Sequence, residues 1–429
     1  MKVEHYCRGA LYAIVGISVF QALIGEYLGF HQCNYLCDVL LILLLIVRMW
    51  ESKGAFIYTL KRVEYLPIAA FGVVILLGWF MNGVPLLHAL WGMRNYGRFF
   101  LFFILVVDFL GPQDAINLEE FFLKLFPIHI TLVVFQYFVG GHKQDALSGL
   151  FGTITGGNGG MAIYFCILLC IMLSRMEYGK MRYPQFLSYL ALMAVNTAAS
   201  ELKFFFVIAV CIAGWYVVVS QKKKRAVTLA VIVCIAMFLG MQLMYQIFPF
   251  WTGYLNPTNI PEVITSQTVY STSTDIGRTA VFSKLTPMIT EWSGKGALAW
   301  GIGLGNADYS DGFSFLNSEF YTVHQASHYT WLSLGYLFSE TGYLGTISYL
   351  AFFGVLELRA LWRYYLKRTR LQMLGTFFPF VALALIVYNS TMRSNFAYMM
   401  FVMLAFSMLE KEKSPQRNTM FRGEKHLEE

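Results

Sequence analysis

Charged side chains are scarce in this sequence, and several of them fall inside or beside long apolar stretches. Asp, Glu, Lys and Arg make up 13% of the 429 residues, against about 25% in a typical soluble domain. Arg94 and Arg98 lie four residues apart in GMRNYGRFF, so a helix would place them on one face. Arg278 (in DIGRTAVF), Arg393 (in NSTMRSNF) and Lys203 (in ASELKFFF) lie far from them in the sequence. Because an ionisable group within a membrane span costs at least about 2.5 kcal/mol, each such residue indicates a function or a partner.

Two histidines and one glutamate add candidate groups for proton transfer. His328 lies in HYTWL, His324 lies four residues earlier, and Glu340 begins ETGYLG. Histidine is the side chain best suited to take a proton from a hydroxyl group near neutral pH. Glu340 could orient such a histidine or pair with an arginine. Ser327 is a good N-cap residue, so His328 could instead simply stand at the start of a helix.

Long apolar stretches must position these residues. The chain is 57% hydrophobic with a mean hydropathy of +0.55, which excludes a soluble globular protein, a disordered chain and a secreted disulfide scaffold. A membrane helix needs about 20 mostly apolar residues. We therefore predict an all-α polytopic membrane protein with twelve spans, near 9–28, 34–50, 65–82, 86–110, 120–140, 159–175, 185–200, 202–220, 226–248, 329–355, 373–391 and 395–410. The apolar run Leu334–Leu361 exceeds one span, and we expect it to tilt or break near Gly342.

The basic residues predict the orientation of these spans. With a cytoplasmic N-terminus, 24 of the 32 Lys and Arg fall on the inner side, which is the positive-inside pattern. Both termini are then cytoplasmic, and the basic runs mark topology rather than a nucleic-acid surface. The same assignment places the other eight Lys and Arg on the outer side. Five of these lie in or beside spans or in the outer loop, and together they favour a cationic cleft for a diphosphate, whose oxygens match guanidinium groups: Arg94, Arg98, Lys203, Arg278 and Arg393. Singly, each has a structural alternative, such as an ion pair between Lys203 and Glu201.

A long polar segment interrupts the spans. Residues 249–328 fall on the outer side, and ordered loops of this length are usually functional. We expect a helix at 279–290 and a turn-rich stretch at 301–305. The predicted parts of the chain are spans at 1–248, an outer loop at 249–328, spans at 329–410 and a charged cytoplasmic tail at 411–429.

Cysteine and histidine spacing predicts neither a disulfide framework nor a metal site. The seven cysteines lie in or beside predicted spans, and the eight histidines lack ligand spacing.

Three segments resemble one enzyme superfamily. They are GRTAVFSKLTPMITEWSGKGALAWGIGLGN (277–306), HYTWL with the later ETGYLG (328–332 and 340–345), and FGTITGGNGGMAIYF (151–165). Their order is similar to that in O-antigen ligases and Wzy-type polysaccharide polymerases. The sequence departs from the family in two places. His328 lies 14 residues before Gly342, about one helical turn more than in the family, so His324 remains an alternative. The usual Ser-Arg pair at the outer end of a middle span is Ser200-Glu201-Leu202-Lys203 here.

The resemblance implies a GT-C-like membrane glycosyltransferase in a bacterial inner membrane, with its active site facing outward. A glycan on undecaprenyl diphosphate would be the donor, a sugar hydroxyl of another lipid-linked repeat unit the acceptor, and the reaction would be inverting and free of metal or other cofactors. Membrane lipid and a chain-length regulator are the expected partners, and nucleic acid is not. The implied catalytic residues are His328, Arg278 and Glu340, and the implied substrate-binding residues are Arg94, Arg98, Lys203, His324 and Arg393.

Two alternatives stay open. An O-antigen ligase of the same superfamily would differ only in its acceptor. A lipid-linked oligosaccharide flippase would also use clustered cations, but transporters usually place their charges near the bilayer midplane and often contain repeats. Here the cations are predicted to be shallow, and no internal repeat is visible.

Overall fold

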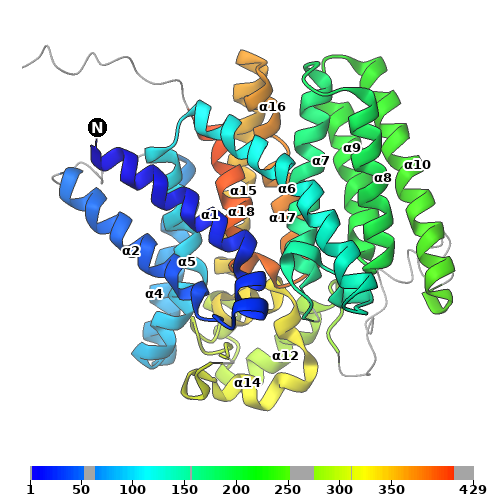
Figure 1. Cartoon of the computed structure of the whole chain (residues 1–429). Coiled ribbons are helices and arrows are strands. Elements are labelled where there is room, and N and C mark those ends of the chain that lie inside the picture. Colours follow the sequence, from blue (N-terminus) through cyan, green and yellow to red (C-terminus); the bar gives the residue numbers. More distant parts are fainter. Residues whose placement is uncertain (1, 53–62, 155–156, 252–274, 311, 410–429) are drawn as a thin grey trace, which may run out of the picture.

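The computed structural model describes residues 2–52, 63–154, 157–251, 275–310 and 312–409, and all regular secondary structure in these ranges is helical (Figure 1). The α-helices are α1 (Lys2–Leu28), α2 (Cys33–Ser52), α4 (Leu66–Asn82), α5 (Leu86–Phe109), α6 (Pro112–Phe138), α7 (Asn158–Glu177), α8 (Tyr183–Ala199), α9 (Lys203–Val219), α10 (Lys223–Ile247), α12 (Val281–Ser293), α13 (Ala297–Trp300), α14 (Glu319–His324), α15 (Ser333–Lys367), α16 (Arg370–Gly375), α17 (Phe378–Tyr388) and α18 (Ala397–Leu404). The predicted tail at 411–429 and residues 252–274 of the predicted loop lie outside the described ranges.

Nine helical segments among the described residues are long and apolar enough to cross a membrane. The chain is therefore an all-helical, multi-pass membrane protein. All twelve predicted stretches are helical, but those near 185–200, 202–220 and 395–410 form shorter helices. α8 and α9 have 17 residues each, and α18 continues only as a short 3-10 turn to Met408. The predicted number of twelve crossings therefore remains an expectation.

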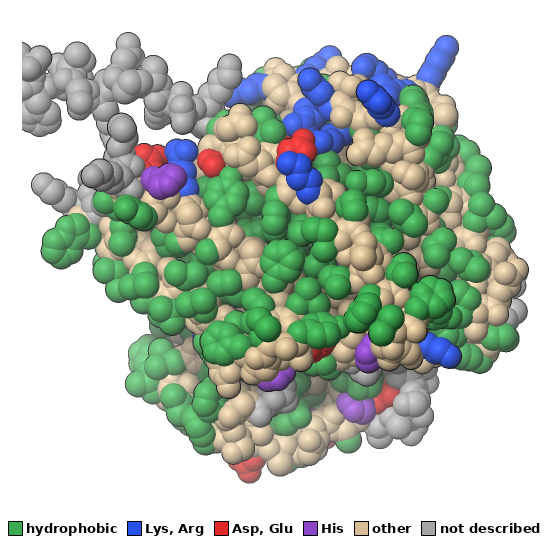
Figure 2. Space-filling view, viewed as in Figure 1, with side chains coloured by type: hydrophobic (Ala, Val, Ile, Leu, Met, Phe, Trp, Pro, Cys, Tyr) green, Lys and Arg blue, Asp and Glu red, His purple; other side chains and the backbone are tan. Residues whose placement is uncertain are grey.

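The two ends of the helical bundle differ in charge. α12 and α14 lie together at one end (Figure 1), which we call the loop end. Lys and Arg side chains gather at the opposite end, the basic end, and a band of apolar side chains lies between the two ends (Figure 2). This is the surface that a bilayer-spanning bundle requires, because the hydrocarbon core excludes charge.

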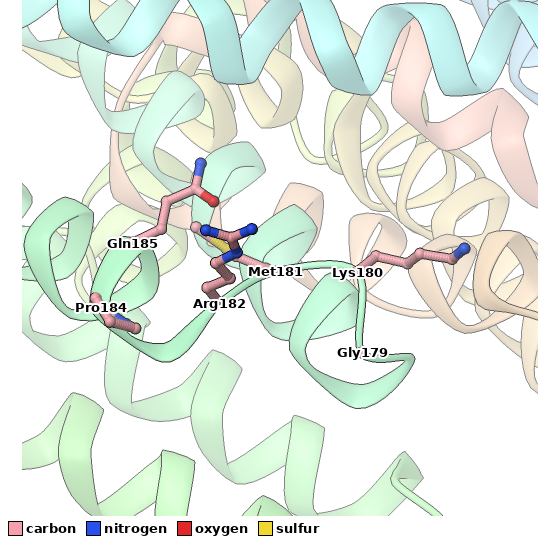
Figure 3. A pocket seen from close by; sticks show the side chains of 6 residues that line it. All are labelled: Gly179, Lys180, Met181, Arg182, Pro184 and Gln185. Atoms are coloured by element: carbon pink, nitrogen blue, oxygen red, sulfur yellow. The ribbon is translucent and has the colours of Figure 1, made fainter.

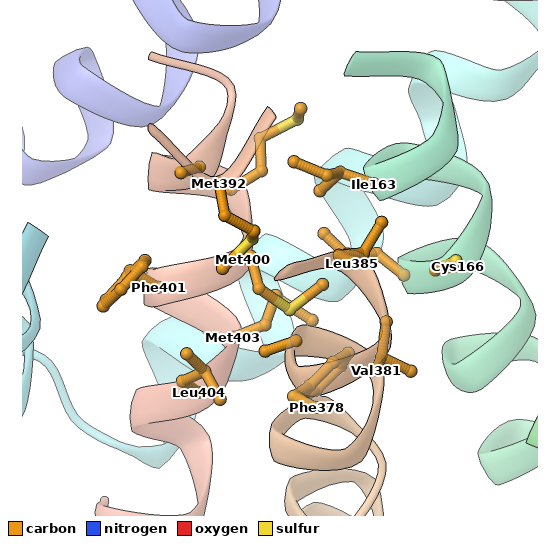
Figure 4. Packing of buried hydrophobic residues seen from close by; sticks show 14 of the residues in the cluster. Ile163, Cys166, Phe378, Val381, Leu385, Met392, Met400, Phe401, Met403 and Leu404 are labelled. Atoms are coloured by element: carbon orange, nitrogen blue, oxygen red, sulfur yellow. The ribbon is translucent and has the colours of Figure 1, made fainter. Parts of the chain in front are cut away.

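α7 forms the centre of the bundle. Its apolar window is 94% buried, and Figure 4 shows side chains of α7, α17 and α18 meeting face to face, including Ile163, Cys166, Leu385 and Met400. Apolar surface gains little by leaving lipid, so close packing must hold such helices together. Unbranched methionines fill irregular gaps in this contact.

The break predicted near Gly342 is confirmed. Gly342 has φ +60° and ψ −161° inside α15, a conformation open to glycine but not to other residues at low cost. The interruption leaves two carbonyl groups of the preceding turn without their usual helical donors. These carbonyls accept hydrogen bonds from the glycine-rich turn instead: Ser339 O from Ile302 N at 2.9 Å and Glu340 O from Gly303 N at 3.1 Å.

The predicted turn at 301–305 is also confirmed and is fixed by contact with helices. Gly301, Gly303 and Gly305 all have positive φ, and a Cβ on Gly305 would lie 1.9 Å from the carbonyl oxygen of His88 in α5. The helix predicted at 279–290 is present as α12. The loop segment is thereby docked onto α4, α5 and the kink of α15.

Candidate functional site at the loop end

His328 and Asp275 form a hydrogen-bonded pair at the loop end. His328 Nδ1 lies 2.6 Å from Asp275 Oδ1, with the Asp275 side chain 1% and the His328 side chain 36% exposed. A carboxylate can only accept, so this contact assigns the ring proton to Nδ1. The lone pair then resides on Nε2, the nitrogen that a general base uses. A buried acid orienting a half-exposed imidazole is the arrangement that general-base catalysis requires.

The backbone around His328 holds the ring in place. His328 has φ +50°, a left-handed conformation between two short 3-10 turns, Gln325–Ser327 and Tyr329–Trp331. Its ring stacks on the indole of Trp331 with centroids 4.1 Å apart. Asp275 is fixed from the other side, because the next residue, Ile276, donates its N–H to Ser327 O at 3.0 Å. A non-glycine residue in this conformation is uncommon and often marks a functional site.

Arg278 follows Asp275 by three residues and is anchored at the end of α17. Its Nε donates to the carbonyl oxygen of Tyr388 at 2.7 Å, and its guanidinium lies 4.9 Å from the centroid of the Tyr388 ring. The same tyrosine ring stacks on Phe204 of α9 at 3.9 Å.

Lys203 joins this group from α9. It lies directly before Phe204, its Nζ is 3.8 Å from Glu201 Oε2, and the positive charge of Arg278 acts on it. Two of the five cations, Arg278 and Lys203, thus meet around Tyr388, which contacts Arg278 directly and Phe204 of α9, although 75 residues separate them in the sequence.

The end of α17 connects Arg278 and Lys203 to the segment 328–333, which contains His328. Asn389, which follows Tyr388, accepts hydrogen bonds on its carbonyl oxygen from the N–H (3.1 Å) and the hydroxyl (2.7 Å) of Ser333. Ser333 begins α15, two residues after Trp331. Four parts of the chain therefore meet here: the segment 275–278, the segment 328–333, the start of α9 and the end of α17. We call the set His328, Asp275, Arg278 and Lys203 the catalytic candidate.

The other three predicted cations lie in a separate network with the acids Asp38, Asp308 and Glu340. Arg393, 8% exposed, is 2.7 Å from Asp308 Oδ2 and 3.8 Å from Glu340 Oε2. Its guanidinium also lies 3.5 Å from the centroid of the Tyr336 ring. Arg393 therefore ties the loop segment to α15 and to the turn between α17 and α18.

Arg94 and Arg98 share one acid of this network. Arg94 Nη2 lies 2.7 Å and Arg98 Nη1 3.5 Å from the two carboxylate oxygens of Asp38 in α2. Arg98 also donates to the carbonyl oxygen of Arg393 at 2.9 Å and to the side chain of Asn395. The predicted helix face is confirmed for this pair. Each of the three arginines therefore has an acidic partner within the protein: Asp38 for Arg94 and Arg98, and Asp308 for Arg393.

Glu340 contacts the backbone of the loop and Arg393. Its Oε1 accepts from Gly305 N at 3.0 Å, and Oε2 faces Arg393. Among the described residues, the acid that contacts His328 is Asp275 and not Glu340.

His324 packs in an aromatic cluster of the loop segment. Its ring centroid lies 4.5 Å from that of Phe320 and 6.2 Å from that of Trp292. Burial lowers the pKa of His324, and the nearby charge of Glu291 opposes this effect. This environment favours the neutral ring and is typical of a packing residue.

A polar segment before α7 borders the catalytic candidate near Lys203. Gln144 donates to Glu201 at 2.8 Å, and Asp145 accepts from Asn158 at 2.7 Å. Burial, followed by the negative charge of Glu201, raises the pKa of Asp145, while Lys203 lowers it.

A cavity of about 740 Å³ lies between α7 and α8, lined by Gly179, Lys180, Met181, Arg182, Pro184 and Gln185 (Figure 3). This segment contains two cations but no acid or histidine, so it offers no acid–base pair. Within the described residues, no three or more His, Cys, Asp and Glu side chains are grouped so that they could hold a metal ion.

Comparison with known protein families finds none whose sequence model matches this chain. A search of curated proteins finds no relative. The resemblance described above therefore rests on the quoted segments.

Sequence reasoning missed the acidic partners. These acids are Asp275 for His328, Asp308 for Arg393 and Asp38 for Arg94. A cation near lipid is costly unless it is paired, so the sequence does predict that each of these cations has an acidic partner. It does not identify which acid that partner is.

Proposed function

We propose that this protein is a Wzy-type polysaccharide polymerase, which transfers a glycan from undecaprenyl diphosphate to a sugar hydroxyl of another lipid-linked repeat unit. The observation that carries the proposal is the His328–Asp275 pair beside Arg278 and Lys203. A base and two cations are what this transfer requires. The base must take a proton from the acceptor, and the cations must neutralise a diphosphate that gains negative charge as it leaves.

In the proposed reaction, His328 Nε2 removes the proton of the acceptor hydroxyl. The acceptor oxygen attacks the anomeric carbon from the face opposite the diphosphate, and the bond between that carbon and the phosphate oxygen breaks. The electron pair of the broken bond stays on undecaprenyl diphosphate, and the anomeric configuration inverts. Asp275 stabilises the imidazolium ion that forms, which later releases its proton to solvent. Base assistance of this kind contributes about 10²–10⁴-fold to a rate.

Arg278 is assigned to the leaving diphosphate. Its Nε donates to the carbonyl oxygen of Tyr388, and this contact fixes the plane of the guanidinium. Lys203 adds a second positive charge on the same side. Donors directed at developing negative charge are worth about 10²–10³-fold in kcat for each donor.

Arg94, Arg98, Arg393 and Glu340 are assigned to the support of this site. Their ion pairs with Asp38 and Asp308 connect α2, α5, α15 and the α17–α18 turn to the loop segment. Arg94 is the most exposed of the three arginines and is the one best able to meet substrate as well.

We further propose twelve crossings with both termini in the cytoplasm of a bacterium, the loop end outside the inner membrane, and a GT-C-like arrangement. The basic end in Figure 2 supports this orientation, because basic residues accumulate on the cytoplasmic side of membrane proteins.

Deletion of the gene in the organism of origin tests the proposal. Loss of a polymerase leaves single repeat units on the final acceptor. Loss of a ligase leaves polymerised glycan on the lipid carrier, and loss of a flippase leaves repeat units facing the cytoplasm. Either of the last two outcomes would contradict the assignment to a polymerase.

A further inference from the structure

A second cavity lies at the basic end, where α9 and α15 both end. It has a volume of about 490 Å³, and its lining includes Val218, Gln221, Lys223, Leu361, Tyr365 and Arg368. The lining combines apolar side chains from the last turns of two helices with two cations, and it contains no Asp or Glu. Val218 is 64% and Tyr365 70% exposed, so the apolar wall faces outward from the bundle, where lipid lies.

The conformation of Arg368 distinguishes this cavity from an ordinary basic helix end. Arg368 ends α15 at φ +47° and ψ +36°, the left-handed position that helices usually fill with glycine. An arginine there is strained, so the chain keeps a guanidinium at a place where glycine would be more stable. The guanidinium lies 5.9 Å from the centroid of the Tyr365 ring. The backbone carbonyl oxygen of Arg368 accepts a hydrogen bond from the Tyr178 hydroxyl at 2.7 Å, and this contact fixes the backbone there.

Glu177 contacts this wall from inside the bundle and is held by hydrogen bonds. Glu177, at the end of α7, accepts hydrogen bonds from Tyr216 (2.8 Å), Ser220 (3.0 Å) and the N–H of Gln221 (3.2 Å). Lys223 donates to the carbonyl oxygens of Val217 and Val218, at 2.7 and 2.8 Å, and so stays at the cavity edge with its charge. The charged side chains that line the cavity are thus both cations, and the hydrogen bonds of Glu177 fix the wall behind them.

We propose that this cavity binds one anionic phospholipid of the surrounding bilayer. The phosphate group lies against Arg368 and Lys223, and an acyl chain lies along Val218 and Leu361. Basic pockets between membrane helices are a recurrent way of holding such headgroups. The bound lipid joins the ends of α9 and α15, whose opposite ends lie at Lys203 and just after His328.

Native mass spectrometry of the full-length protein, titrated with phosphatidylglycerol or phosphatidylcholine, tests this proposal. The main variant is Arg368→Gly, which removes the guanidinium and suits the left-handed backbone, so it should unfold at the wild-type temperature or above. Arg368→Asn, which also tolerates that conformation, is the second variant. The control is Lys224→Gln, an exposed neighbour that does not line the cavity.

The expected result is preferential binding of phosphatidylglycerol by the wild type. Affinity should be about fivefold weaker in both Arg368 variants, corresponding to the ~1 kcal/mol contributed by a basic residue at an anionic surface, and unchanged in Lys224→Gln. Equal loss in the control variant, equal binding of phosphatidylcholine, or wild-type affinity in both Arg368 variants would overturn the proposal. Displacement of the lipid by millimolar inorganic phosphate would also overturn it, because the site would then be a phosphate site.

Discussion

The imidazole of His328 lies 2.6 Å from the carboxylate of Asp275, a residue 53 positions earlier in the chain. The pair is formed by two parts of one loop segment, and the contact from Ile276 N to Ser327 O fixes them together. His328 is therefore positioned by the loop segment, and Arg278 and Lys203 lie at the end of α17 and the start of α9.

Replacement of the positioning acid should impair turnover more than binding. In Asp275→Asn the amide group can donate to Nδ1, which places the ring proton on Nε2 and removes the base. We expect kcat to fall by about 10²–10⁴-fold, with little change in KM because Asp275 is buried. Steady-state kinetics on lipid-linked donor would measure both constants. Glu291→Gln, an exposed acid of the same segment, is the control and should behave as wild type.

Arg278 should not be replaceable by lysine. Arg278→Ala and Arg278→Lys should both lower kcat by about 10²–10³-fold, the contribution of one donor to a developing anion. A lysine ammonium group cannot donate to the Tyr388 carbonyl oxygen and also offer the diphosphate the planar set of donors of a guanidinium. Lys295→Gln, which removes an exposed cation nearby in the sequence, should leave kcat unchanged. Recovery of activity with lysine would show that only the positive charge matters.

Arg393 should matter chiefly for stability. Arg393→Met leaves the buried carboxylate of Asp308 without its 2.7 Å partner, and breaking a buried pair costs about 3–5 kcal/mol. Thermal unfolding in detergent should show this loss, and the double variant Arg393→Met/Asp308→Asn should recover a large part of it. A single variant that unfolds like the wild type but cannot bind donor would instead place Arg393 in the binding site.

The kink of α15 should depend on glycine at one position and not at another. Gly342→Ala would place a Cβ 2.6 Å from Gly301 N at a φ of +60°, so the glycine-rich turn should detach and the unfolding temperature should fall. Gly354→Ala, in the same helix with no atom within 4 Å of the added Cβ, should be close to wild type. Similar losses from both substitutions would show that α15 tolerates no added methyl group anywhere.

Asp145 predicts a specific pH dependence of stability. Burial and the charge of Glu201 raise the pKa of Asp145 in the folded protein, so the folded state binds the proton more tightly than the unfolded chain. This group therefore costs stability above its unfolded pKa of about 3.9 and costs nothing well below it. Asp145→Asn, which can still accept from Asn158, should raise the unfolding temperature at pH 7.5, and the gain should vanish toward pH 3. A gain that persists at pH 3 would exclude titration of Asp145 as its cause.

Local features of the sequence predicted the helices well. The stretches 65–82 and 86–110 correspond to Leu66–Asn82 and Leu86–Phe109, because hydropathy and flanking turn residues are properties of neighbouring residues. The predicted stretch 120–140 begins too late. α6 begins at Pro112, where the Asp114 side chain accepts a hydrogen bond from Gly111 N at 2.8 Å, and this first, polar part of the helix lacks the apolar signal. The break at Gly342 was predicted because a run longer than one span contained a glycine.

Tertiary partners were beyond the same reasoning. Sorting charges by side predicted that Arg94, Arg98, Lys203, Arg278 and Arg393 share a face, but not that they form two groups. Asp308 meets Arg393 across 85 residues and Asp38 meets Arg94 across 56. No spacing rule predicts such pairs, because they depend on how the helices pack.

The most direct test of the proposed function is a transfer assay with the purified protein reconstituted in liposomes and supplied with lipid-linked repeat units. The account predicts that the wild type forms glycans of two or more repeats and releases undecaprenyl diphosphate. His328→Ala should form them about 10²–10⁴-fold more slowly. Translocation of the repeat units without elongation, or full elongation by His328→Ala, would contradict it.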